Sequence, residues 1–280
     1  MEEREYYGVR KGFFIQNERS DIDMFKRAFL ILYRKLYKEG YFQAYFGKQC
    51  VDYDNSIEGY LGSDIETAIY LKTKNKELWP IHERIESFSL VDLFTVIELL
   101  YDCSSKPISS YDHDWNNCGI HVTQSDDEFG KLDFRNQINP MLKKYLKVEL
   151  SKDGEILEIV EEGFEPLFLA PIPSEDKNVK SRIDSAVIKF RRKVSTVDDR
   201  RDALRDLADV LEYLRSKIKT VLMSKEENEL FQIANTFGIR HHNKNQKTDY
   251  DIPIWHSWFF YCYYSTIHAC LRLIEKQKQD

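Results

Sequence analysis

The chain has 280 residues, enough for one large domain or two ordinary ones, each with a hydrophobic core. Its 42% hydrophobic and 31% charged residues exclude a disordered or fibrous protein and are typical of a globular one. The formal net charge of −6 excludes a general attraction to nucleic acid, so contact with RNA or DNA would need a local basic patch.

The cysteines and the N-terminus indicate the compartment. An odd number of cysteines without a CxxC pair predicts free thiols in a reducing environment; they are Cys50, Cys103, Cys118, Cys262 and Cys270. The first residues lack the charged and apolar segments of a secretory signal. The most apolar window, residues 252–274, contains His256, His268 and Arg272, which favour a buried helix over a membrane span. We therefore expect a cytoplasmic protein without a membrane partner.

The first predicted helix follows Ser20, a suitable N-cap, and carries Asp21 and Asp23 in its first turn. Gly40 is predicted to end it. Between these ends, apolar side chains recur with the helical period at Phe25, Phe29, Leu32 and Leu36. This pattern predicts an amphipathic helix with one buried face.

Two more helices are predicted in the first hundred residues. Ser63 is expected to cap a second helix that ends near Lys74. Ser89 is expected to cap a third over residues 90–103, whose apolar face is wide. The N-terminal region is therefore predicted to be mostly helical.

The middle of the chain predicts two small β-hairpins. Residues 118–123 and 131–136 flank an acidic turn and are expected to pair with each other. Residues 148–160 form a clearer hairpin, because Asp153 and Gly154 separate two β-favouring runs. Residues 137–147, between the two hairpins, are predicted to be a helix.

Residues 166–177 contain three prolines and no periodic pattern, so they are predicted to link two domains. Residues 1–165 would form a mostly helical region with small β-hairpins, and residues 178–280 a helical domain. The expected fold class is mainly α, with an α+β N-terminal half and a C-terminal helical bundle.

The C-terminal part predicts four helices. Residues 178–193 are amphipathic, and Thr196 with Asp199 opens a longer helix over residues 195–222. Its apolar stripe consists of Leu204, Leu207, Leu211, Leu214, Ile218 and Val221. A third helix is predicted to begin at a capping box of Ser224 and Glu227 and to end at Gly238.

Pro253 begins the final predicted helix, which is aromatic and leaves almost no polar face over its first half. A helix that is apolar on nearly all sides is buried, either at the centre of the bundle or against a second copy of the chain. Tyrosine and tryptophan suit either environment, because they bury a ring and keep a polar group bonded.

Residues 234–251, with the sequence ANTFGIRHHNKNQKTDYD, form a polar stretch between the last two predicted helices. Arginine grips phosphate through its planar fork, and histidine near neutral pH can give or take a proton. Cleavage of RNA through its 2′-hydroxyl requires a base, an acid and a cation near the phosphate. The N-terminus of the following helix would add backbone donors for the anion.

The pattern RHHNKNQ after an amphipathic helix resembles the C-terminal domain of abortive-infection proteins, including the AbiJ type, which belong to the HEPN group of helical ribonucleases and nucleotide-binding domains. The resemblance covers residues 181–276. It implies a helical bundle that forms a homodimer, with the two motifs meeting at the interface. It also implies a bacterial defence or toxin-like protein with a metal-independent ribonuclease activity and no cofactor.

The group's motif is an arginine, a polar residue, three to five arbitrary residues and a histidine. Arg240 matches the arginine and His241 the polar position, whereas no histidine occupies residues 244–247. By this resemblance, Arg240 would hold the scissile phosphate, His241 or His242 would act as base or acid, and Gln246 would orient phosphate or water. Further contacts to RNA or phosphate would come from Asn243, Asn245 and Lys247.

The same stretch also fits a non-catalytic role. Arg240, His241 and His242 suit the C-terminus of the preceding helix, where cations are favoured. The rival hypothesis is therefore a non-catalytic interaction or nucleotide-binding protein with the same helical dimer fold. The missing motif histidine favours it, and the density of Arg, His, Asn and Gln favours the ribonuclease. Expected partners are a second copy, RNA or a nucleotide, and a neutralising or triggering protein.

Other candidate sites are less favoured. A metal site of His241, His242 and His256 with Asp249 or Asp251 is disfavoured, because adjacent histidines rarely point the same way. No metal and no cofactor are therefore expected. The sequence also lacks the glycine-rich motifs of phosphate-loop and dinucleotide-binding proteins.

Two local clusters allow a functional and a structural interpretation. Residues 112–121, DHDWNNCGIH, place Cys118 near His113 and His121, which would suit a cysteine nucleophile. A hydrogen-bonded cluster at the edge of a strand is favoured instead. The basic run KFRRK, residues 189–193, could contact RNA phosphates, but the acidic residues after it favour a self-neutralising surface.

Overall fold

The computed structural model of the chain describes residues 7–11, 21–52, 57–115, 118–222 and 251–279. The described residues form helices and two two-stranded sheets, so the predicted mainly α fold is confirmed. The chain divides into an N-terminal unit, Met1–Ile156, and a C-terminal unit, Leu157–Asp280. The predicted linker, residues 166–177, falls inside the C-terminal unit. There α8 (Glu165–Leu169) and the residues after it place Leu167, Phe168 and Ile172 against the core.

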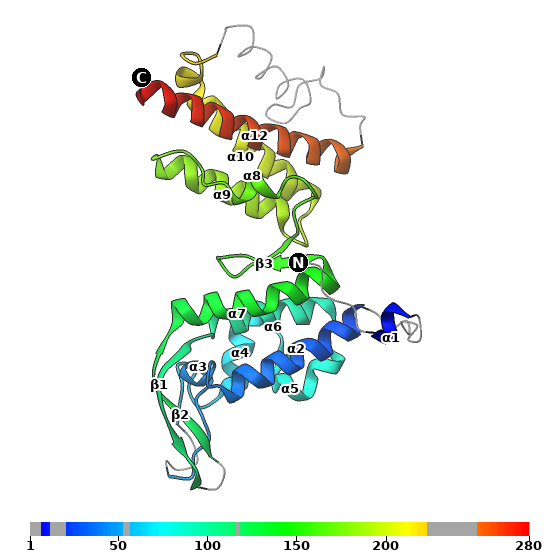
Figure 1. Ribbon diagram of the computed structural model, residues 1–280, viewed down its shortest axis with the longest axis vertical. Coiled ribbons are helices and arrows are strands. Elements are labelled where there is room, and N and C mark those ends of the chain that lie inside the picture. The colour runs from blue at the N-terminus through cyan, green and yellow to red at the C-terminus, as the bar shows by residue number, and fades with distance from the viewer. Residues whose placement is uncertain (1–6, 12–20, 53–56, 116–117, 223–250, 280) are drawn as a thin grey trace. The chain divides into compact units, whose positions relative to one another are not determined.

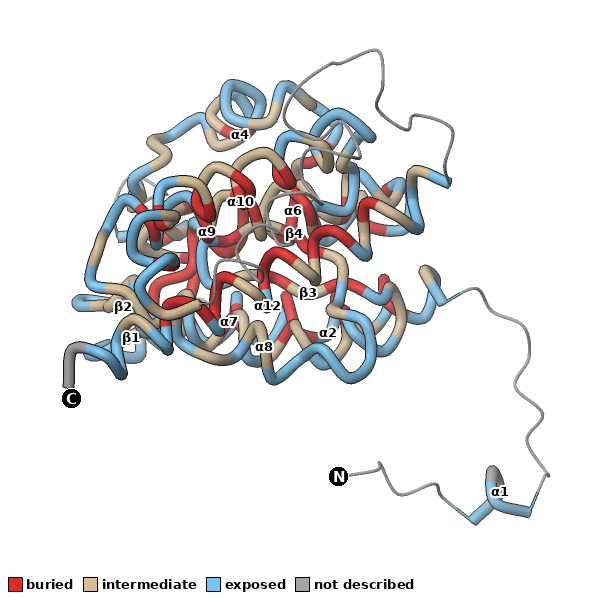
Figure 2. Tube along the Cα trace, turned by 90° about the horizontal axis from the view of Figure 1, so that it is seen from above, coloured by how far each residue is buried: buried red, intermediate tan, exposed pale blue. Residues whose placement is uncertain are grey.

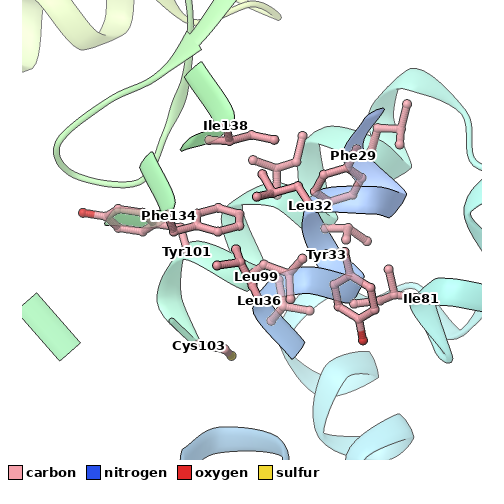
Figure 3. Close-up of a cluster of buried hydrophobic side chains, with 14 of the residues drawn as sticks. Phe29, Leu32, Tyr33, Leu36, Ile81, Leu99, Tyr101, Cys103, Phe134 and Ile138 are labelled. Atoms are coloured by element: carbon pink, nitrogen blue, oxygen red, sulfur yellow. The ribbon is translucent and has the colours of Figure 1, made fainter. Parts of the chain in front are cut away.

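Three helices build the core of the N-terminal unit: α2 (Asp21–Lys38), α6 (Leu90–Asp102) and α7 (Asp127–Met141). The predicted apolar stripe of α2 is buried, and Gly40 follows the helix with a φ of +88°, as expected for a residue that ends one. The predicted cap of α6 is also confirmed, because Ser89 and Asp92 form a reciprocal capping box. Figure 3 shows side chains of these helices in contact, among them Phe29, Leu32, Leu36, Leu99, Phe134 and Ile138.

Shorter helices complete this unit. They are α1 (Tyr7–Arg10), α3 (Gln43–Phe46), α4 (Ile65–Thr73) and α5 (Ile81–Arg84), with 3₁₀ turns at Lys76–Leu78 and Ile85–Ser87. Asp64, rather than the predicted Ser63, caps α4, because its carboxylate accepts a hydrogen bond from Thr67 N at 3.0 Å. Ser20 lies outside the described residues, so its predicted capping role stays a prediction.

The first predicted hairpin has the wrong partner strand. Residues 118–123 do lie in a strand, β2 (Gly119–Asp126), but this strand pairs antiparallel with the preceding β1 (Lys106–His113). Residues 131–136 belong to α7, because Asp126 caps that helix by accepting a hydrogen bond from Phe129 N at 2.9 Å. β1 is mostly exposed and lacks alternating apolar residues, so its sequence carries no strand pattern. Figure 1 shows β1 and β2 extending away from the helices of this unit.

The second predicted hairpin is confirmed. β3 (Val148–Leu150) and β4 (Ile156–Glu158) form a two-stranded sheet, and Gly154 takes a φ of +86° in the turn between them. The predicted helix over residues 137–147 is also present, although it is the end of α7 continued by a π-helical turn, Leu142–Leu146. Lys147 ends it in the left-handed conformation, with a φ of 55°.

Three long helices form the C-terminal unit: α9 (Lys177–Arg191), α10 (Val197–Ile218) and α12 (Ile252–Gln279). The capping box of Thr196 and Asp199 is confirmed, and so is the apolar stripe of α10 from Leu204 to Ile218; the helix ends there, so Val221 lies in the turn after it and is half-buried. Figure 2 marks the buried stretches of each helix in red. One side of α12 is buried, whereas Ile254 and Trp258 are 66% and 47% exposed. No helix in the described part of the chain is long and apolar enough to cross a membrane. The predicted helix at residues 225–238 lies outside that part.

Candidate metal centre

Four metal-ligating side chains meet where the β1–β2 hairpin approaches the segment that follows α3. His113 is the last residue of β1, Cys118 directly precedes β2, and His121 is the third residue of β2. Cys50 comes from the segment after α3. The two sulfur atoms and one nitrogen atom of each imidazole all lie within 4.8 Å of one another. We call these four residues the metal centre.

The segment that carries Cys50 is shaped by close backbone contacts. Gly47 follows α3 with a φ of +71°, and a Cβ atom there would lie 2.2 Å from the carbonyl oxygen of Ile57. Only glycine fits this approach. Lys48 and Ile57 then exchange two backbone hydrogen bonds, of 2.8 and 2.7 Å. Cys50 therefore projects from a tightly folded segment rather than from an extended loop.

Side chains of α3 and of the segment after it attach both to β2. The amide of Gln43 donates to Ile120 O at 2.8 Å and accepts from Val122 N at 3.0 Å. The ammonium of Lys48 donates to Ile120 O at 2.6 Å. These bonds occupy backbone groups on the edge of β2 and bring Cys50 towards the end of the hairpin.

Within the metal centre the sulfurs and imidazoles are paired. Cys118 Sγ lies 3.0 Å from His121 Nε2, and Cys50 Sγ lies 3.7 Å from His113 Nδ1. The far nitrogen of His113, Nε2, lies 3.0 Å from a carboxylate oxygen of Asp52. That pairing favours the tautomer with the proton on Nε2, in which the Nδ1 lone pair faces Cys50.

The centre is largely shielded from solvent. Cys50 and His121 are each 3% exposed, and His113 and Cys118 are half-buried. The ring of Tyr111 stacks on His121, with centroids 5.1 Å apart and planes at 14°. Nδ1 of His121 is buried and has no hydrogen-bond partner among the described residues. A buried imidazole is costly without partners, so His121 requires a strong interaction at Nε2.

The protonation states argue against a cysteine nucleophile. Burial, with a contribution from neighbouring Cys50, raises the pKa of the Cys118 thiol. Burial also lowers the pKa of His121, as do the charges of Lys48 and His113. The pair therefore consists of a neutral thiol and a neutral imidazole, whereas a nucleophilic cysteine needs a thiolate at neutral pH. The contacts agree with the favoured sequence interpretation, a hydrogen-bonded cluster at a strand edge.

The four donor atoms favour zinc over the other common metal ions. Two sulfurs and two imidazole nitrogens suit Zn²⁺ in a tetrahedral site, whereas Mg²⁺ and Ca²⁺ require oxygen ligands. Bond lengths of about 2.0–2.3 Å place tetrahedral ligands roughly 3.3–3.8 Å apart. The separations here run from 3.0 Å, between Cys118 Sγ and His121 Nε2, to at most 4.8 Å, so small shifts in both directions would bring the four atoms to tetrahedral spacing. Four protein ligands leave no open position, which is the pattern of a structural rather than a catalytic zinc site.

The sequence pointed to His113, Cys118 and His121 but not to Cys50, and it led to the expectation of no metal. His113, Cys118 and His121 lie within one short stretch, but Cys50 precedes His113 by 63 residues. The spacing of three ligands, His-x4-Cys-x2-His, was visible and indicated chemistry at this stretch. The fourth ligand could be found only from the fold, because α3 and β2 bring it in.

The predicted ribonuclease residues lie outside the described residues: Arg240, His241, His242, Asn243, Asn245, Gln246 and Lys247. The basic run in residues 189–193 is described, and acidic groups neutralise it. Lys189 pairs with Asp206 at 2.6 Å, and Lys193 pairs with Glu158 at 3.4 Å. The predicted self-neutralising surface is therefore confirmed for these lysines.

Comparison with protein-family models, curated proteins and solved structures finds no match to this chain. The resemblance of residues 181–276 to the HEPN group therefore stays a prediction.

Proposed function

We propose that the N-terminal unit binds one Zn²⁺ ion through Cys50, His113, Cys118 and His121, and that the ion fixes the β1–β2 hairpin to the segment after α3. One observation carries the proposal. Two thiols and two imidazoles from segments far apart in sequence converge within 4.8 Å, without an oxygen ligand among them.

The hairpin has a physical need for such an ion. A two-stranded sheet is marginally stable by itself and requires packing against other elements. β1 is mostly exposed, with Ile108 66% exposed, so apolar burial contributes little along this strand. A structural zinc site contributes folding free energy directly, because the site exists only in the folded chain. The metal centre would thus take the place of a small hydrophobic core at this end of the unit.

Each ligand has a distinct role in holding the ion. The thiols of Cys50 and Cys118 would bind as thiolates and neutralise its charge. His113 would bind through Nδ1 while Nε2–H donates to Asp52, and His121 would bind through Nε2 under the ring of Tyr111. Zn²⁺ itself supplies four strong, directional bonds and no redox chemistry.

Metal content tests this function. The full chain, stripped with a chelator and reloaded, is expected to retain one equivalent of zinc after desalting. Cys50→Ser and Cys118→Ser are each expected to retain far less, whereas Cys262→Ser, a half-buried cysteine of the C-terminal unit, is the matched control. Co²⁺ loading should produce the visible absorption of a tetrahedral thiolate site. Equal zinc retention by all four proteins, or none by the wild type, would rule out the assignment.

We propose a second function for the C-terminal unit, a metal-independent ribonuclease of the HEPN type in a bacterial defence or toxin-like role. The support is the stretch with Arg240, His241 and His242, which lies in sequence between α10 and α12 of a helical bundle. The resemblance also implies a homodimer. The rival is a non-catalytic interaction or nucleotide-binding protein with the same dimer fold.

Growth of a bacterial host during controlled expression separates the two. If the chain is a ribonuclease, expression of the natural sequence should arrest growth. Arg240→Ala and His241→Ala/His242→Ala, expressed at the same protein level, should each abolish the arrest. RNA cleavage by the purified chain should persist in a chelator, since no metal takes part. Conversion of both histidines to glutamine should abolish cleavage; full activity after that change would refute the catalytic assignment.

A further inference from the structure

We infer that the metal centre is also an oxidant-responsive dithiol: a peroxide joins Cys50 and Cys118 in a disulfide, and the zinc ion leaves. This inference rests on the proposed zinc function and adds a regulation to the same site. It starts from the observation that the two cysteines come from different segments and that their sulfur atoms lie within 4.8 Å of each other.

The sulfur atoms are positioned to react with each other. Cys50 and Cys118 belong to the set whose ligand atoms all lie within 4.8 Å of one another. A disulfide requires a separation of about 2.0 Å. Neither cysteine lies in a helix or strand, so no regular element opposes the remaining approach.

The two cysteines differ in solvent exposure, and this difference determines which of them reacts with the oxidant first. Cys118 is half-buried, so a small oxidant can reach its sulfur. Cys50 is only 3% exposed. Cys118 is therefore the cysteine that meets the oxidant, and Cys50 is the resolving cysteine.

The other cysteines are unsuited to this reaction. Cys103 and Cys270 are 1% and 2% exposed, each in the hydrophobic core of its own unit. Burial raises the pKa of Cys103 to about 12, which keeps it a thiol. Cys262 lies in α12, in the other unit from the metal centre. Oxidation should therefore select Cys50 and Cys118.

The reaction balances with a peroxide as the oxidant. The Cys118 thiolate attacks one peroxide oxygen, the O–O bond breaks, and a sulfenic acid and hydroxide form. The Cys50 thiolate then attacks the sulfenic sulfur, the S–S bond forms, and a second hydroxide leaves. The sulfurs give up two electrons, and the peroxide is reduced to two hydroxides, which take protons from solvent. Zn²⁺ keeps its charge and loses two of its four ligands.

The result of oxidation is a chemical change rather than a loosened hairpin. The disulfide would keep Cys50 and Cys118 connected, so the segment after α3 stays attached to β2 through Gln43 and Lys48 as well. His113 and His121 are left without an ion, and one metal ion per chain enters solution. A thiol reductant reverses the reaction, because it regenerates both thiols for metal binding.

The test uses the zinc-loaded full chain treated with hydrogen peroxide. A metallochromic indicator should report the release of one zinc equivalent. Titratable thiols in the denatured chain should fall from five to three, and peptide mapping should identify a Cys50–Cys118 disulfide. Zinc release and thiol loss should occur together, one zinc equivalent for two thiols, and a thiol reductant should restore both the thiols and zinc binding. Cys262→Ser is the matched control and should behave as the wild type.

The outcomes separate the two proposals. A chain that holds no zinc before peroxide is added refutes the zinc function itself. A chain that holds zinc but keeps it under peroxide, or that forms a disulfide with any other cysteine, overturns only the redox inference. Zinc release without a Cys50–Cys118 disulfide in the peptide map, or zinc binding that reduction does not restore, also overturns the redox inference.

Discussion

A carboxylate oxygen of Asp52 lies 3.0 Å from Nε2 of His113, while Nδ1 of the same ring is directed at Cys50. Asp52 therefore determines which nitrogen of His113 carries the proton and which is available to a metal. The carboxylate is 58% exposed and its histidine 19%, so Asp52 acts from the solvent side of the ring.

The first prediction is that Asp52→Ala weakens zinc binding without removing a ligand. Partners of this kind typically change metal affinity by about 10–100-fold, because they fix the ring and raise its basicity. Competition with a chelator of known affinity measures the change. Asp112→Ala, an exposed aspartate on β1, is the matched control and should bind as the wild type. Equal affinity in Asp52→Ala would show that the contact has no role in metal binding.

The second prediction concerns stability. A ligand that binds only the folded state stabilises it by about 2.7 kcal/mol at 100 times its Kd. For a unit of this size that corresponds to a rise in Tm of about 5–10 °C. Scanning calorimetry with zinc and with chelator should show this shift in the wild type and none in Cys50→Ser. A Tm that is the same in both buffers would contradict a structural role for the ion.

The third prediction tests the turn of the second hairpin. A Cβ at Gly154, where φ is +86°, would lie 2.6 Å from the ring of Tyr101. This ring is fixed, because its hydroxyl donates to Lys152 O at 2.5 Å and the side chain is buried. Gly154→Ala should therefore lower the free energy of unfolding by about 1–2 kcal/mol for the backbone and about 1–3 kcal/mol more for the overlap.

Gly62→Ala separates these two contributions. Gly62 has a φ of +77° but open space around its Cβ position. It should therefore show only the backbone cost, measured for both variants by urea unfolding of the full chain. Equal losses for the two variants would mean that the Tyr101 ring moves aside freely.

The sequence predicted α2, α6, α9 and α10 well, because their signals are local, whereas it predicted residues 131–136 of α7 as a strand. Each cap, at Ser89 and at Thr196, involves residues of a single helical turn, and each lies where expected. The apolar stripe of α10 repeats with the helical period, and its residues from Leu204 to Ile218 are buried as expected. The turn at Gly154 is equally local, since a positive φ favours glycine whatever surrounds it.

The strand partner and the metal centre were missed because both depend on tertiary structure. β1 has almost no buried face of its own, so nothing in its sequence distinguishes it from a loop. Cys50 comes near the other three residues because Gly47 permits a close backbone turn and Gln43 bonds to β2. His113, Cys118 and His121 could be recognised as a chemical cluster, but three ligands in one stretch do not distinguish a hydrogen-bonded edge from a metal site.

The last prediction is an acid sensitivity of the C-terminal unit. His268 of α12 is 3% exposed, and burial lowers its pKa, with Arg272 one turn away adding to the effect. In the unfolded chain a histidine titrates near pH 6.5. Below about that pH the unfolded state therefore binds a proton that the folded state does not. Stability must then decrease as the pH falls, until the folded pKa is passed.

Urea unfolding of the full chain at pH 7.5 and pH 5.5 measures this dependence. The wild-type midpoint should be lower at pH 5.5, and His268→Gln should reduce the difference. Part of the decrease should remain, because burial and the charges of Arg201 and Arg200 also lower the pKa of His256. His82→Gln, at an exposed histidine, should keep the full wild-type difference. The same pH dependence in His268→Gln and the wild type would show that this buried histidine is not the group that titrates.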